Sequence, residues 1–192
     1  MQKNLEFYLK KYEGFLDAKE CSIAIQELKK KKWNQHTFYN PVEGVAETIS
    51  GNKELDISFQ EPSNHAYFMQ RFWDALHEYV VKDMNFSWYN GWRGYSNIRY
   101  NMYKKTRIMA EHCDHIHSLF DHGVNKQTGI PILSILAILN DDYVGGELIF
   151  WQDTEIKVST GDILVFPSNF LYPHRVEAIT KGTRFSAVSW TW

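Results

Sequence analysis

The second half of this chain contains a series of short apolar segments, and their near-regular spacing limits the folds open to it. Eight such segments follow Tyr95, and they are rich in β-branched and aromatic residues. They cover about residues 97 to 103, 108 to 115, 131 to 139, 146 to 151, 154 to 158, 162 to 167, 173 to 178 and 184 to 191. Turn formers such as Gly145-Gly146 and Lys181-Gly182 separate them. Eight short strands at this spacing predict a β-sandwich or jelly roll.

The first half of the chain predicts helices that support such a sheet. An N-cap signal at Asp17 opens a first helix, which runs out in four lysines from Lys29 to Lys32. A second helix is expected from about Pro62 to Lys82, because its apolar residues recur every four positions. We expect a single domain over residues 1–192, with 1–95 as helical support and aromatic loop and 96–192 as the jelly-roll core.

The aromatic loop from Trp88 to Tyr95 contains an Asn-Gly turn signal. One interpretation is a hairpin that packs its aromatic side chains over the edge of the core. The other is a rim that grips an extended substrate.

Composition and charge argue against several classes of protein. The net charge is −2 with both signs mixed, so no global field favours nucleic acid or an anionic membrane. No apolar run approaches the roughly 18 residues of a membrane span, and the charged start Met1 to Glu6 does not resemble a secretory signal. Cys21 and Cys113 are too far apart for a zinc knuckle. We expect a cytoplasmic protein, and the oligomeric state stays open.

A cluster of potential metal ligands lies at the end of the second apolar segment, where residues 111 to 117 read Glu-His-Cys-Asp-His-Ile-His. Alternate residues of a strand share a face, so His112 and Asp114 are expected to project together. A jelly roll makes neighbours of strands that are distant in sequence, which would bring His174 to the same cavity. Two histidines and one carboxylate suit non-heme Fe(II) with open coordination positions.

Arg184 lies ten positions after His174 and opens an alternating apolar run that ends at Trp192. This run predicts a largely buried strand, and a buried cation needs an anionic partner. A dicarboxylate ligand would provide one.

From about Tyr100 to Trp192 the chain resembles the Fe(II)- and 2-oxoglutarate-dependent dioxygenases, and among them most closely the prolyl 4-hydroxylase group. The resemblance rests on the residues just described, with Gly145-Gly146-Glu147 and the segment from Gly161 to Pro167. It implies a mainly β fold with flanking helices, the cupin-like double-stranded β-helix. Two departures are Lys104 to Arg107, where a glycine-rich link is common, and arginine at 184, where collagen-type members often have lysine.

The resemblance also implies roles for single residues. His112, Asp114 and His174 would bind iron, and Arg184 would pair with the distal carboxylate of 2-oxoglutarate. Tyr103 falls where such enzymes often place a tyrosine whose hydroxyl also meets the cosubstrate. Ser186 completes an Arg-x-Ser pattern that some branches use.

The activity so implied is that of a procollagen-proline 4-dioxygenase-like enzyme acting on a proline-containing peptide or protein. Fe(II), 2-oxoglutarate and O₂ would couple oxidative decarboxylation, giving succinate and CO₂, to hydroxylation of a C–H bond. The iron supplies the chemistry, so no catalytic side chain beyond the iron ligands is expected. The resemblance also suggests ascorbate as a cofactor.

Three other interpretations stay open. The same chemistry could act on another amino acid, a small molecule or a nucleobase. The chain could be a non-catalytic cupin-like module that binds a metal. The histidines at 115, 117 and 122 also raise the question of zinc, but substrate-side or surface roles are favoured for them.

Overall fold

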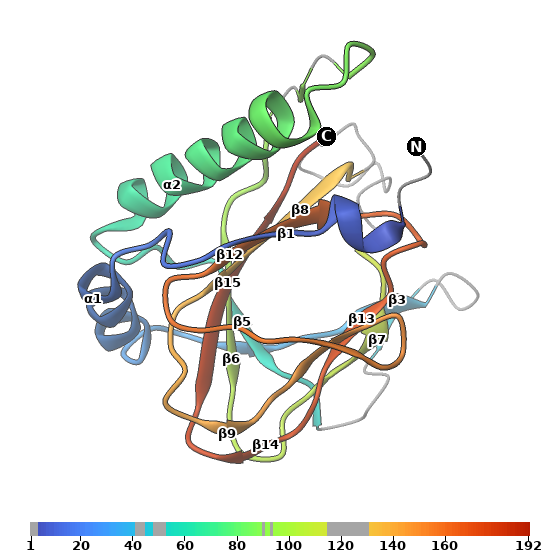
Figure 1. Cartoon of the computed structure of the whole chain (residues 1–192). Helices are drawn as coiled ribbons and strands as arrows, with labels where there is room; N and C mark the ends of the chain where they lie inside the picture. Colours follow the sequence, from blue (N-terminus) through green and yellow to red (C-terminus); the bar gives the residue numbers. More distant parts are fainter. Residues whose placement is uncertain (1–3, 41–44, 48–52, 90, 93, 115–130) are drawn as a thin grey trace.

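Two antiparallel β-sheets lie opposite each other in the computed structural model, and two helices cover the outer face of the larger sheet (Figure 1). The structure describes residues 4–192 apart from 41–44, 48–52, 90, 93 and 115–130.

The larger sheet has seven strands and draws on both halves of the chain. In spatial order they are β1 (Lys10–Tyr12), β12 (Ile163–Pro167), β8 (Leu133–Ile138), β15 (Arg184–Trp190), β6 (Arg99–Tyr103), β5 (Asp56–Ser58) and β2 (Asn34–Gln35). The smaller sheet has four, β11 (Thr154–Ile156), β10 (Leu148–Phe150), β13 (His174–Val176) and β7 (Met109–His112). Two short pairs complete the strands, β9 (Val144–Gly145) with β14 (Ile179–Lys181) and β3 (Phe38–Asn40) with β4 (Val45–Glu47).

The helices lie in the first half of the chain. They are the 3₁₀ turn η1 (Leu5–Tyr8), α1 (Ala18–Leu28), α2 (His65–His77) and the π-helical η3 (Glu78–Met84) that continues α2. The side chain of Asp17 accepts a hydrogen bond from the amide of Lys19 at 2.7 Å, so the expected N-cap is confirmed. Within the described ranges, no helix is both long and apolar enough to cross a membrane.

The central strands of the large sheet are buried on both faces. Ile135 and Ala137 of β8 pack with the apolar residues of α1 and α2, whereas Leu136 and Ile138 point into the space between the sheets. β12 and β15 divide their side chains in the same way. The helices therefore cover one face of this sheet and leave its other face free to line a site.

Each of the eight predicted segments contains a strand, so that part of the prediction is confirmed. The segment expected at 108 to 115 is wrong at its end, because β7 stops at His112 and Asp114 lies in a bend beyond it. Besides the helices, the first half supplies β1, β5 and β2, which extend the large sheet within segments where the sequence allows short strands, residues 6 to 16 and 33 to 61.

The hairpin interpretation of residues 88 to 95 is wrong for the residues that the structure describes. Their one strand-like pairing is the isolated bridge between Tyr95 and Thr191. The aromatic rings instead pack on α2, where Trp92 lies 5.1 Å from Trp73 between ring centroids. Asn90 of the turn signal lies outside the described residues, while Tyr89, Trp92 and Tyr95 pack against the core as that interpretation expected.

Candidate functional site

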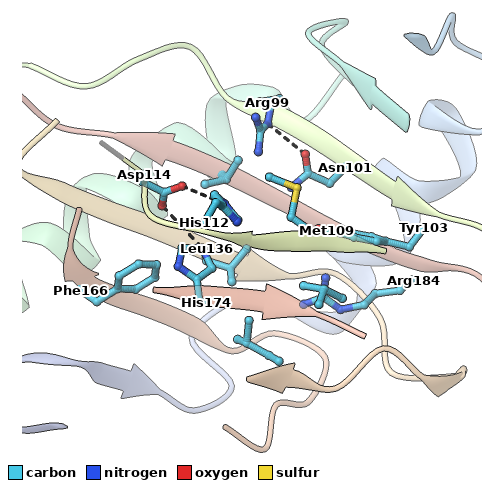
Figure 2. A pocket seen from close by; sticks show the side chains of 13 residues that line it. Arg99, Asn101, Tyr103, Met109, His112, Asp114, Leu136, Phe166, His174 and Arg184 are labelled. Carbon is cyan, nitrogen blue, oxygen red and sulfur yellow. Dashed lines mark hydrogen bonds and ion pairs between the residues drawn. The ribbon is translucent and has the colours of Figure 1, made fainter. Parts of the chain in front are cut away.

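His112, Asp114 and His174 converge between the two sheets (Figure 2). One potential ligand atom from each residue lies within 4.8 Å of the other two. Nε2 of His112 is 3.4 Å from Oδ1 of Asp114, and Nε2 of His174 is 3.9 Å from Oδ2. Of the described residues, these three form the one cluster of this kind. Its donor set of two imidazoles and a carboxylate suits a divalent transition metal with open positions.

Sheet topology explains why residues so far apart in sequence meet. β7 and β13 are antiparallel neighbours, and His112 and His174 are partners in their register. Asp114 lies two residues beyond β7, and the hydroxyl of Ser134 on β8 donates to its Oδ2 at 2.6 Å. Hydrogen bonding across the site, and not strand alternation alone, therefore orients the carboxylate.

Backbone carbonyls hold both imidazoles in the tautomer that metal binding requires. Nδ1 of His112 lies 2.8 Å from the carbonyl oxygen of Ala110, and Nδ1 of His174 lies 3.1 Å from that of Tyr172. A carbonyl can only accept a hydrogen bond, so each Nδ1 carries the proton. The lone pair of each Nε2 is left to face the centre of the cluster.

The charge states of His174 and Asp114 favour the binding of a cation. Burial, reinforced by the neighbouring His112, lowers the pKa of His174 to about 4, so this imidazole is neutral at pH 7. Burial alone would raise the pKa of Asp114, but His174, His112 and the Ser134 hydroxyl outweigh it. The pKa of Asp114 therefore lies below its ordinary value, and the carboxylate is ionised.

Arg184, at the start of β15, lines the same pocket and is fully buried. Its Nε donates to the hydroxyl of Tyr143 at 3.1 Å, and its guanidinium lies 5.0 Å from the centre of the Tyr103 ring. Nη1 and Nη2 have no hydrogen-bond partner among the described residues. Buried donors without acceptors are costly, so an acceptor such as a carboxylate is the kind of group that this end of the pocket could bind.

The double glycine that precedes Glu147 packs directly against this end of the pocket. Gly145 and Gly146 have φ of +81° and +71°, a conformation that favours glycine. A Cβ at Gly145 would overlap the carbonyl oxygen of Ala178, and one at Gly146 would lie 2.4 Å from Cδ1 of Ile179. The absent side chains therefore let β9 approach β14.

Tyr103 lies where the sequence prediction needs it, opposite Arg184 in the register of β6 and β15. It is 3% exposed, and burial raises the pKa of its hydroxyl above the ordinary value. The hydroxyl therefore stays protonated at neutral pH and can donate a hydrogen bond to a ligand.

The pocket is lined by further residues that the sequence prediction missed. Its polar lining includes Arg99 and Asn101 as well as the predicted residues, and its apolar lining is Met109, Leu136, Leu148, Phe166, Val176 and Val188. The hydroxyl of Tyr143 accepts a hydrogen bond from Arg184, and the hydroxyl of Ser134 donates one to Asp114. Alternation was the available signal for Arg99 and Asn101, because they share a strand face with Tyr103.

Other sequence predictions do not reach this pocket. The histidines at 115, 117 and 122 lie outside the described residues, so their proposed roles stay predictions. None of the described residues of the aromatic loop lines the pocket. Ser186 is buried beneath the pocket and lies 3.4 Å from the amide nitrogen of Asn101.

Comparison with known proteins identifies relatives of the second half. Residues 98–192 match the family model described as the 2OG-Fe(II) oxygenase superfamily. A PKHD-type hydroxylase of Hyphomonas neptunium is 39% identical over 100 residues, which are 48% of this chain and 42% of the relative. Another from Aliarcobacter butzleri is 33% identical over 96 residues, 47% and 41% of the two chains. The match thus spans about two fifths of the length of these curated relatives.

Solved structures resemble nearly the whole chain in fold. A viral collagen prolyl hydroxylase from Paramecium Bursaria Chlorella virus-1, in complex with 2OG, aligns with a TM-score of 0.62 at 16% identity, covering 96% of this chain and 94% of that one. A Trichoplax adhaerens prolyl hydroxylase, in complex with a hypoxia inducible factor peptide fragment, aligns with a TM-score of 0.70 at 14% identity, covering 96% and 83%. The predicted double-stranded β-helix with flanking helices is therefore confirmed.

Proposed function

Because residues 98–192 belong to the 2OG-Fe(II) oxygenase superfamily, we propose that this protein is an Fe(II)- and 2-oxoglutarate-dependent dioxygenase that hydroxylates peptidyl proline. The observation that carries this proposal is the buried guanidinium of Arg184. Its two Nη groups lack partners among the described residues, and it shares one pocket with the His-Asp-His cluster. A non-catalytic metal-binding module gains nothing from a buried, unpaired cation next to the metal, whereas a 2-oxo acid cosubstrate requires one.

The residues of the pocket divide the work of binding. His112, Asp114 and His174 hold Fe(II), and the carbonyls behind the two imidazoles fix their orientation. Arg184 takes the distal carboxylate of 2-oxoglutarate, and the hydroxyl of Tyr103 donates to the same cosubstrate. The bound metal, with O₂ and 2-oxoglutarate, supplies oxidative decarboxylation and the oxidation of a C–H bond.

The protein's own contribution is orientation and exclusion of water. Phe150 stacks on the ring of His174 with 5.0 Å between centroids, and Phe166 meets the same ring edge-on at 5.2 Å. Met109, Leu136 and Val188 close the remaining walls. An apolar enclosure of this kind strengthens the electrostatic contacts inside it and keeps bulk water from the reacting atoms.

Peptidyl proline is the proposed target because the structural similarity points to it, and the names of the sequence relatives support a hydroxylase. The structural relatives with known complexes are prolyl hydroxylases, and one of them holds a peptide fragment. The sequence relatives carry the name PKHD-type hydroxylase. Ascorbate dependence stays a prediction.

A metal and cosubstrate titration tests the cofactor assignment. Anaerobic addition of Fe(II) and 2-oxoglutarate to the wild type should produce a weak visible charge-transfer band, and admission of O₂ should then release succinate. His112→Ala should abolish both. His77→Ala is the matched control, because His77 is exposed at the end of α2 and should leave both unchanged. If His112→Ala keeps the band and still releases succinate, the site is assigned wrongly.

Mass spectrometry of proline-rich peptides after turnover tests the substrate. The expected product gains one oxygen on proline. A gain on another residue, with succinate release intact, would keep the oxygenase and overturn the proline assignment.

A further inference from the structure

A second guanidinium, that of Arg99 on β6, lines the metal pocket and has no role in the function proposed above. Its side chain is 91% buried, since only 9% of the residue is exposed. Figure 2 shows it at the Asp114 and His112 end of the pocket, whereas Arg184 lies with Tyr103 at the other end.

The register of the large sheet separates the two cations. Arg184 pairs with Tyr103, and Arg99 pairs with Val188, four residues further along both strands. Four residues of a strand span about 13 Å. Arg99 therefore does not belong to the carboxylate site formed by Arg184 and Tyr103.

Neighbouring side chains hold Arg99 in one orientation. Its Nε donates to Oδ1 of Asn101 at 3.1 Å, and Asn101 in turn contacts the hydroxyl of Ser186 at 3.4 Å. The guanidinium lies 4.9 Å from the centre of the Trp190 ring. No carboxylate of the described residues forms an ion pair with it, and no hydrogen bond of its Nη groups to those residues is present. The side chain is thus fixed at Nε, with its outer donors left for another group.

Charge balance in the loaded pocket shows what that group must be. A divalent metal and Arg184 together neutralise Asp114 and the two carboxylates of 2-oxoglutarate, and His174 is neutral. Among the residues that line the pocket, Arg99 then remains as one positive charge without a counter-charge. Buried charges are paired in folded proteins, so the full complex needs one more anion at this end of the pocket.

We propose that Arg99 binds a carboxylate of the primary substrate, so that the enzyme selects prolines with a negative charge directly beside them. This inference rests on the proposed function and adds a specificity-determining residue to it. The carboxylate can come from an aspartate or glutamate side chain next to the proline, or from the α-carboxylate of a C-terminal proline. A planar guanidinium fork recognises either group by paired hydrogen bonds.

Calorimetric binding of peptide twins to the protein tests this, with the protein loaded anaerobically with Fe(II) and 2-oxoglutarate so that no turnover occurs. One set of pentapeptides has glutamate before or after a central proline, and its twin has glutamine there. A second pair ends in proline as the free acid or as the amide. The wild type should bind the acidic member of at least one pair about tenfold or more tightly than its twin. The pair that shows the preference identifies the source of the carboxylate.

Two variants connect the preference to Arg99. Arg99→Gln should remove it, and Arg99→Lys, which keeps the charge, should retain part of it. The charge-transfer band and the affinity for 2-oxoglutarate should stay unchanged in both, which also shows that they fold. A weaker affinity for 2-oxoglutarate in Arg99→Gln would assign Arg99 to the cosubstrate and overturn the proposal.

The wild-type comparison decides the matter even if a variant does not fold. Equal affinities within every twin pair, or no binding of any peptide, overturn the role of Arg99. If the band is present and succinate is released, that result leaves the oxygenase assignment standing. Absence of the band in the wild type counts against the proposed function itself.

Discussion

Arg184 is a residue whose burial should lower stability, and its proposed role is to bind the cosubstrate. It is 0% exposed, and its Nη atoms have no partner among the described residues. Replacing a buried charge by an apolar side chain of similar volume is often neutral or stabilising by about 1–4 kcal/mol. Arg184→Met should therefore leave the apo protein equally or more stable to denaturant, while weakening 2-oxoglutarate binding by about a hundredfold or more.

Urea unfolding and 2-oxoglutarate titration of the Fe(II)-loaded protein measure the two effects. Arg175→Met is the control, because Arg175 is paired with Glu177 at 2.7 Å near the surface and should change neither quantity much. Loss of apo stability in Arg184→Met would show that the guanidinium contributes to the fold, against its assignment as a ligand site.

At the residue scale, the sequence predicts those members of the site that belong to a pattern. His112 and Asp114 form a spaced pair, and Arg184 opens an alternating strand. Tyr143 stands alone in the sequence, and the alternation that places Arg99 on one strand face with Tyr103 does not by itself show that this face lines a pocket. Tertiary packing, which buries one and places the other against Arg184, gives them their roles.

At the element scale, the contact between β9 and β14 depends on a glycine. Gly145 has φ of +81°, and any Cβ there would overlap the carbonyl of Ala178. Gly145→Ala should lower the free energy of unfolding by more than the roughly 1–2 kcal/mol that a left-handed conformation alone costs an alanine. The displaced β14 should also weaken 2-oxoglutarate binding, because Arg184 follows it directly.

Gly14→Ala is the matched control for this strand pair. Gly14 has φ of +57°, but a Cβ there meets nothing within 4 Å, so its substitution should show only the conformational cost. Thermal unfolding and 2-oxoglutarate titration of both variants measure the difference. Equal destabilisation would mean that the close approach of Ala178 does not matter.

Long strands with a clear apolar pattern could be predicted from the sequence, and very short strands could not. β8 has six residues and is almost continuously apolar, and β15 has seven residues with an alternating start, so both are evident in the sequence. β2 has two residues and β1 and β5 have three each, too few to establish a period. The sheet to which they pair, and not their own sequence, makes them strands.

At the scale of the whole molecule, buried imidazoles make the fold sensitive to acid. Burial lowers the pKa of His36 to about 3, and burial with His112 lowers that of His174 to about 4. Histidines of the unfolded chain take up protons near pH 6.5, so below that pH the unfolded state binds more protons than the folded state. Stability of the apo protein is therefore full above about pH 6.5 and falls as the pH drops toward 4.

Urea unfolding of the apo protein between pH 7.5 and 5 measures this loss, at most about 1.4 kcal/mol per pH unit for each of the two histidines. His36→Gln should remove roughly half of the slope. A free energy of unfolding that stays constant from pH 6.5 to 5 would contradict the prediction.

The architecture could be predicted from the sequence because it follows from spacing. Eight regularly placed strands indicate a jelly roll, and that topology places His174 beside His112. The conformation of the loop at 88 to 95 could not be predicted in the same way. It depends on contacts with α2, such as that between Trp92 and Trp73. The extent of the domain as drawn from sequence stays a prediction.

The two-sided burial of β15 has a consequence for how the chain avoids misassembly. Phe185 packs toward the helices, while Arg184 beside it points into the metal pocket. A shift of this strand by one residue would bury the Arg184 guanidinium among the apolar helix contacts and place the Phe185 ring in the pocket beside the His-Asp-His cluster. The register that buries β15 correctly is therefore also the register that forms the pocket. A molecule with a shifted β15 would be unstable and would lack the pocket.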